Sequence, residues 1–188
     1  MDNLDYQVGI LKTPETITKD GLDVRFAVNT LAPYLLTHLL LPLMDSNSRV
    51  ISLSSAAQAP VNPKAMSGET KLADNMEAYS QSKLALTMWS RHMALSHKEN
   101  WPIFIAVNPG SLLATKMVKE GFGMEGHDIN IGVDILLRLS LEDEFKTASG
   151  EYYDNDAKRI GPPHQDALNP QKSAAIVQVI EEILNGFT

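Results

Sequence analysis

Tyr79 and Lys83 are the residues whose types and spacing most clearly suggest chemistry. They lie four positions apart, so on a helix the phenol and the ammonium share one face. A free tyrosine has a pKa of ~10, but a neighbouring fixed cation favours the phenolate and lowers that pKa. The pair therefore predicts a general acid/base for a carbonyl or alcohol oxygen. The spacing alone is common, and a surface tyrosine and lysine on an ordinary helix also fit it.

Two predicted strands end in residues that suit the same site. Residues 49–55 form a short β-branched run, which predicts a buried strand with Ser55 at its end. Residues 102–108 predict a second buried strand, which ends in the turn Pro109-Gly110. Open α/β sheets build their sites at the carboxyl ends of strands, so we expect the Ser55 hydroxyl to meet a substrate oxygen there.

Asn29 is a further candidate, because Pro33 follows it four residues later in a helix predicted over residues 21–44. Proline has no N–H, so the carbonyl of Asn29 loses its helical partner and the helix should kink there. A freed carbonyl that faces the site can hold a water molecule. A kink that only serves packing explains the same two residues.

An asparagine, a serine at a strand end, the Tyr79–Lys83 pair and a Pro-Gly turn follow one another along the chain, and this order resembles the short-chain dehydrogenase/reductase family. The long interval between Ser55 and Tyr79 resembles its retinol-dehydrogenase-like branch. The resemblance runs from about residue 8 to the C-terminus and implies an NAD(P)-dependent oxidoreductase that acts on a carbonyl or alcohol. It implies four catalytic residues: Asn29, Ser55, Tyr79 and Lys83. In the family, a water links the asparagine to the lysine and feeds protons to the tyrosine.

The resemblance also assigns binding residues. Those implied for the cofactor are Gly9, Tyr79, Lys83, Pro109, Gly110 and Thr115, and those implied for the substrate are Ser55, Met117 and Phe122. Residues 111–126 fall where the family places its substrate lid, although Met117, Phe122 and Met124 also suit plain packing. Residues 59–75 either contribute to substrate selection or form a passive surface loop, and their prolines and glycine slightly favour the loop.

Helical and strand-like segments alternate, which predicts an α/β fold with a mostly parallel sheet and flanking helices. The predicted helices cover 21–44, 76–97, 128–141 and a last segment that starts at Asn169-Pro170 and stops at Gly186; the predicted strands are 49–55, 102–108 and 150–153. Residues 111–127 are predicted as a loop. With the resemblance, this indicates one domain, residues 1–188, that forms the catalytic portion of a Rossmann-like, doubly wound fold.

The dinucleotide fingerprint of such folds is a glycine-rich turn between the first strand and helix, and we find none. In place of the family's Asn-Asn-Ala-Gly segment stands Tyr6-Gln7-Val8-Gly9, of which only the glycine fits. We therefore expect NAD or NADP to bind this chain weakly or not at all. Either the reading frame is truncated, the sequence is part of a longer chain, or the protein has lost its cofactor half.

Composition narrows the remaining function classes. The net charge of -7 argues against a nucleic-acid partner, and the absence of cysteine excludes disulfides and cysteine-ligated metals. We expect no metal, no signal peptide and a cytoplasmic location. The most apolar stretch, residues 31–44, is shorter than the ~20 residues of a membrane span, so we expect a buried helix and no span.

Two other functions stay open besides the oxidoreductase with a small-molecule substrate. A non-catalytic remnant could act as an oligomerisation or interaction module, since the helices at 76–97 and 111–141 correspond to those that pair subunits in the family. We accordingly expect a homo-oligomer, with a dimer as the simplest case. Alternatively, the same four residues could serve epimerisation or dehydration.

Overall fold

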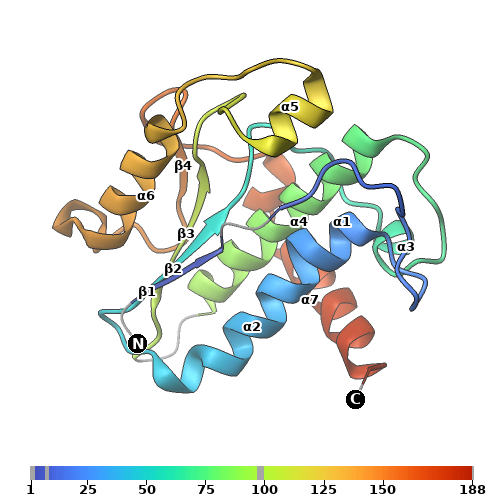
Figure 1. Ribbon diagram of the computed structural model, residues 1–188. Coiled ribbons are helices and arrows are strands. Elements are labelled where there is room, and N and C mark those ends of the chain that lie inside the picture. Colours follow the sequence, from blue (N-terminus) through green and yellow to red (C-terminus); the bar gives the residue numbers. More distant parts are fainter. Residues whose placement is uncertain (1–2, 7–8, 97–99, 188) are drawn as a thin grey trace.

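A five-stranded sheet runs through the centre of the protein (Figure 1). The computed structural model describes residues 3–6, 9–96 and 100–187. The strands lie in chain order: β1 (Asn3–Tyr6), β2 (Arg49–Leu53), β3 (Ile103–Asn108), β4 (Tyr152–Asp154) and β5 (Arg159–Gly161). β1 to β4 are parallel, and β5 returns antiparallel to β4. The predicted mostly parallel α/β sheet is confirmed. β1 and β5, with 4 and 3 residues, were too short to show a pattern.

The long helices follow the predicted segments, and four short helices lie outside them. In chain order they are α1 (Val24–Phe26), the π-helical turn η1 (Ala27–Leu31), α2 (Ala32–Leu40), η2 (Leu41–Leu43), α3 (Pro63–Met66), α4 (Asn75–Leu95), α5 (Lys116–Phe122), α6 (Asn130–Leu141), η3 (Asp143–Phe145), η4 (Gln165–Leu168) and α7 (Pro170–Asn185). The four are α3, α5, η3 and η4, and α5 shows that the prediction of a loop over 111–127 was wrong. Its seven residues, with a glycine among them, are too few for a periodic signal.

Helices cover both faces of the sheet, as the doubly wound arrangement requires. On one face, α1, α2, α4 and α7 enclose a core around Phe26, Trp89, Phe104 and Ile180. On the other face, α6 packs over a smaller core, in which Ile135 and Leu139 contact strand side chains. Figure 1 shows these two helical layers with the sheet between them.

The helical stretch from α1 to η2 differs from its prediction in two respects. Leu35 and Leu39, expected to be buried, are 42% and 66% exposed, while the polar Asn29, Thr30 and Thr37 are buried. These polar side chains join Phe26, Leu31 and Tyr34 on the buried face because they hydrogen-bond to α4 or to their own helix. The length argument against a membrane span was also wrong, because Val24–Leu43 is a single stretch of 20 residues, long and apolar enough to span a bilayer by length and composition.

Apolar side chains on α6 are exposed in the described part of the chain. The outer edge of β1 pairs with no described strand. On α6, every fourth residue of one stripe is an exposed apolar side chain: Ile129, Val133, Leu137 and Leu141. Arg138 lies over the Phe145 ring, on the flank nearer β4. The stripe lies on a different side of the helix from the buried Ile135 and Leu139.

Candidate functional site

The long helix α4 carries Tyr79 and Lys83 on one face, as their spacing requires. Asp74 caps the helix by accepting a hydrogen bond from the Glu77 amide at 2.8 Å, which starts α4 one turn before the tyrosine. The Lys83 ammonium lies 5.7 Å from the centre of the Tyr79 ring. It is almost fully buried and donates a hydrogen bond of 2.7 Å to the carbonyl of Leu53, at the end of β2.

Burial shifts the pKa values of both residues. Because Lys83 is desolvated, its pKa falls to about 8. Burial also raises the pKa of Tyr79, and a hydrogen bond with Ser55 lowers it in part. The predicted lowering of the Tyr79 pKa by Lys83 is therefore wrong for the protein without a cofactor. The phenol sits in a desolvated cavity, and the ammonium donates to a backbone carbonyl on the β2 side.

Ser55, rather than its neighbour Ser54, faces the phenol. The Ser55 Oγ accepts a hydrogen bond from the Ala57 amide at 3.1 Å and pairs with the Tyr79 hydroxyl. Ser54 turns toward α4, where its hydroxyl lies 2.6 Å from that of Thr87. The predicted strand end thus brings one serine to the site and uses the other to hold strand and helix together.

Asn29 lies behind the site and acts through its side chain. Its amide donates to the Ile10 carbonyl at 3.0 Å and to the Ser82 hydroxyl at 2.9 Å, and its Oδ1 accepts from the Ile10 N–H at 2.9 Å. The helix around it widens into the π turn η1, where the Ala32 N–H bonds the Ala27 carbonyl. The kink predicted from Pro33 stays a prediction, and the π turn is a feature that the sequence did not predict. The predicted water on the Asn29 carbonyl stays a prediction.

Gly9 lies close to both buried polar side chains. A Cβ placed on it would come within 3.2 Å of Lys83 Nζ and 3.5 Å of Asn29 Oδ1. A side chain at this position would therefore press on the lysine. Gln7 and Val8, the preceding residues of the segment compared with the family, lie outside the described residues.

The Pro109-Gly110 turn is held by residues that sequence reasoning missed. Gly110 has a φ of +129°, which disfavours any side chain, and Asn155 donates to the Pro109 carbonyl at 2.8 Å. Asp156 accepts from the Ser111 amide at 2.9 Å, so the hairpin after β4 supports the turn. The sequence did offer a signal for them: residues 154–156 are three consecutive polar residues directly after a predicted strand.

One cavity of about 730 Å³ joins most of the predicted residues. Its lining includes Gly9, Ser55, Tyr79, Lys83, Pro109, Gly110, Thr115, Met117 and Phe122, whereas Asn29 is not part of it. Thr115 also caps α5, since its hydroxyl accepts from the Val118 amide. Other apolar linings are Leu11, Leu53, Met76, Leu112, Leu113 and Val118. The cavity therefore combines the polar side chains of Ser55, Tyr79 and Lys83 with apolar walls, an arrangement common in small-molecule sites.

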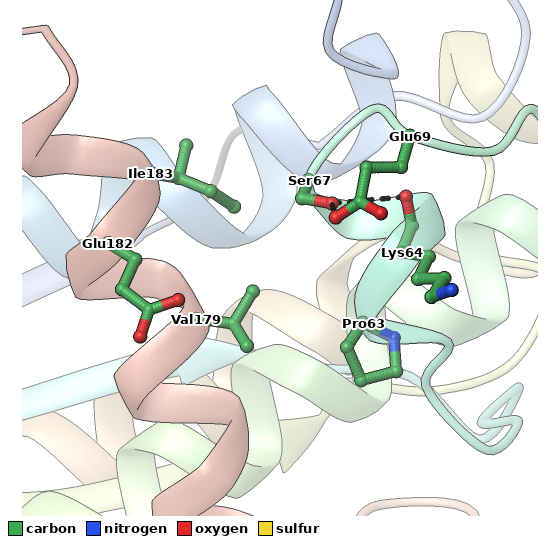
Figure 2. A pocket seen from close by; sticks show the side chains of 7 residues that line it. All are labelled: Pro63, Lys64, Ser67, Glu69, Val179, Glu182 and Ile183. Carbon is green, nitrogen blue, oxygen red and sulfur yellow. Dashed lines mark hydrogen bonds between the residues drawn. The ribbon is translucent and has the colours of Figure 1, made fainter.

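The segment 59–75 contributes nothing to that cavity. Its short helix α3 packs against α7, and a smaller hollow of about 280 Å³ lies between them (Figure 2). Figure 2 shows the Ser67 hydroxyl bonded to the Glu69 carboxylate, with Glu182 across the hollow on α7. These contacts favour the passive interpretation of the segment.

Comparison with known proteins decides the family. The family model described as short chain dehydrogenase matches residues 2–125, about two thirds of the chain. The protein belongs to the short chain dehydrogenase family. The resemblance inferred from four ordered motifs is thereby confirmed.

Retinol dehydrogenases are among its curated relatives. The chain is 24% identical to retinol dehydrogenase 13 of Mus musculus over 184 residues, covering 88% of this chain and 55% of that protein. It is 34% identical to retinol dehydrogenase 12 of Bos taurus over 118 residues, covering 61% and 37%. The chain thus spans about half the length of the curated relatives it matches.

Solved structures show the same fold. An uncharacterized protein from Mycobacterium paratuberculosis superposes with a TM-score of 0.72 at 24% identity, covering 97% of this chain and 66% of that one. NADPH-bound carbonyl reductase from chicken fatty liver superposes with a TM-score of 0.60 at 22% identity, covering 86% and 66%. The partial Rossmann-like fold is confirmed.

Proposed function

We propose that this protein carries the catalytic part of an NAD(P)-dependent oxidoreductase that interconverts a ketone or aldehyde with an alcohol. The observation that carries the proposal is the Ser55–Tyr79 hydroxyl pair, which lies in one cavity with the buried Lys83. A phenol beside a serine hydroxyl can bind one carbonyl oxygen at two points and exchange a proton with it.

Each residue has a distinct task in this proposal. The nicotinamide, when bound, supplies or accepts the hydride at the substrate carbon. In the reductive direction, Tyr79 gives its proton to the substrate oxygen, so that hydride and proton together convert the carbonyl to an alcohol. Ser55 orients that oxygen by a hydrogen bond. Lys83, with a pKa of about 8, is mostly protonated at neutral pH and supplies a cation beside the phenol.

The site suits only one end of the cofactor. Gly9, Lys83 and the Pro109-Gly110 turn line the cavity at the position expected for the nicotinamide and its ribose. In the described residues no glycine-rich turn links a strand to a helix at a place that could hold the pyrophosphate. A few hydrogen bonds, each ~0.5–1.5 kcal/mol, fall short of the ~8 kcal/mol of micromolar binding. NAD(P) therefore binds this chain weakly or not at all.

Substitution of Tyr79 tests the proposal. In a full-length form that carries a cofactor-binding half, Tyr79→Phe should abolish NAD(P)H-dependent reduction of ketones and aldehydes while cofactor binding, measured by nicotinamide fluorescence, persists. Tyr153→Phe serves as the matched control with activity retained, because it also removes a buried phenol hydroxyl but lies outside the cavity, against Phe145. Turnover that survives in the Tyr79→Phe variant would refute the assignment.

The exposed apolar stripe of α6 favours one alternative function, a non-catalytic interaction module. The exposed stripe of α6 offers an apolar face for a partner, whereas α4 is largely covered by α1, α7 and β3. Absence of any nicotinamide fluorescence response at millimolar cofactor, in a form with the cofactor half present, would favour this module. Homo-oligomer formation, a cytoplasmic location, and epimerisation or dehydration at the same site stay predictions.

A further inference from the structure

The backbone carbonyl of Ser55 is held at two points by side chains from outside its own strand. The Tyr152 hydroxyl, on β4, donates to it at 3.0 Å, and the Gln58 amide donates at 2.9 Å. Gln58 is itself fixed, because its Oε1 accepts from the His164 N–H at 3.1 Å. Three separate parts of the chain therefore converge on the peptide that follows the serine side chain.

Tyr152 is suited to act as a permanent donor. Its side chain is 5% exposed and reaches the Ser55 turn from β4, across the intervening strand β3. Burial and the nearby Asp154 carboxylate raise the pKa of Tyr152, although a hydrogen bond with Gln58 lowers it in part. The hydroxyl consequently keeps its proton, and with it the bond to the carbonyl, at any ordinary working pH.

We propose that Tyr152 and Gln58 are positioning residues, which fix the Ser55 peptide so that the serine hydroxyl meets the Tyr79 phenol. The inference rests on the proposed function, because it concerns the same hydroxyl pair. Neither residue lines the cavity, so both act through Ser55. A carbonyl held in one direction fixes the peptide plane and, through it, the direction in which the Ser55 side chain leaves the backbone.

The hydrogen bond between Ser55 and Tyr79 supplies a readout that does not depend on turnover. This bond lowers the pKa of Tyr79 against the effect of burial. When the serine is no longer held in place, the bond weakens and the Tyr79 pKa rises. The charged side chains lining the cavity, Lys83 and Lys116, remain in every variant and keep the background constant.

The test is an NMR titration of the 188-residue chain labelled with 13C at the tyrosine Cζ atoms, with the Tyr79 signal assigned by its loss in Tyr79→Phe. We expect Tyr152→Phe and Gln58→Leu each to raise the Tyr79 pKa by about half a unit, the scale of one net hydrogen bond. Tyr153→Phe is the matched control. Tyr153 is equally buried but points into the opposite core, against Phe145, so its removal should leave the Tyr79 pKa unchanged.

Two results would overturn the proposal: a Tyr79 pKa in Gln58→Leu within about 0.2 units of the wild-type value, or an equal rise in Tyr153→Phe. Gln58 is half-buried, so this variant keeps the test decisive if Tyr152→Phe does not fold. The proposed function fails by a different result. A full-length form that is inactive would contradict the function, even if the Tyr79 pKa still responds to these variants.

Discussion

Lys83 provides the sharpest test of the electrostatics, because it is a buried cation with no carboxylate at salt-bridge distance among the described residues. Its pKa falls from 10.5 to about 8 in the folded protein, because burial penalises the ammonium. Between these two values the unfolded chain binds more protons than the folded one. The free energy of unfolding therefore rises with pH in this range, and the full cost of the buried charge is present below pH 8.

The magnitude follows from the two pKa values. Lys83→Met removes this titration, so the stability of the wild type relative to the variant should increase by about 2.5 kcal/mol between pH 7 and pH 10. Lys83→Met also removes the hydrogen bond to the Leu53 carbonyl, which changes the absolute stability of the variant. The prediction therefore concerns how the difference in free energy of unfolding between the two proteins changes with pH, and not the size of that difference at one pH.

Urea denaturation of both proteins at several pH values between 7 and 10 measures this slope. Lys116→Met is the control, since Lys116 lines the same cavity but its side chain is 86% exposed. We expect the control to follow the wild type at every pH. Parallel curves for Lys83→Met and the wild type, within about 0.5 kcal/mol, would show that burial does not lower the lysine pKa as reasoned.

Two further predictions concern packing around the site. Asn29→Ala leaves the Ile10 amide and carbonyl without their buried partner, so it should lower the free energy of unfolding by about 2–4 kcal/mol in urea; a loss no larger than that of the exposed Asn130→Ala would contradict the role given to this side chain. The double substitution Val133→Ser and Leu137→Ser, at positions 44% and 53% exposed, should reduce binding of the dye ANS while changing stability by less than about 1 kcal/mol. Unchanged dye binding would show that the α6 stripe is not an accessible apolar surface.

Sequence spacing was informative wherever chemistry depends on neighbours along one helix or at one strand end. Tyr79 and Lys83 share a face of α4 because an α-helix repeats every 3.6 residues, and Ser55 reaches the site because it ends a buried strand. The family, the mostly parallel sheet and the start of α7 at Pro170 were accessible for the same reason.

Other features depended on contacts between residues far apart in the chain. The exposure of Leu35 and Leu39 could not be read from periodicity, since the polar Asn29 and Thr30 take buried positions through hydrogen bonds to α4. The direction of the Tyr79 pKa shift was misjudged because burial raises this pKa, and the hydrogen bond with Ser55 only partly offsets that effect.

Residue types and local spacing by themselves determined which groups could react and in what order they lie along the chain. The tertiary structure alone decided how these groups are held and how they ionise. Tyr152 reaches the Ser55 carbonyl, and Asn29 reaches Ile10, only after distant segments have packed. The pKa of a side chain depends on its burial and its hydrogen bonds, and both are set by residues that come close only in the folded protein.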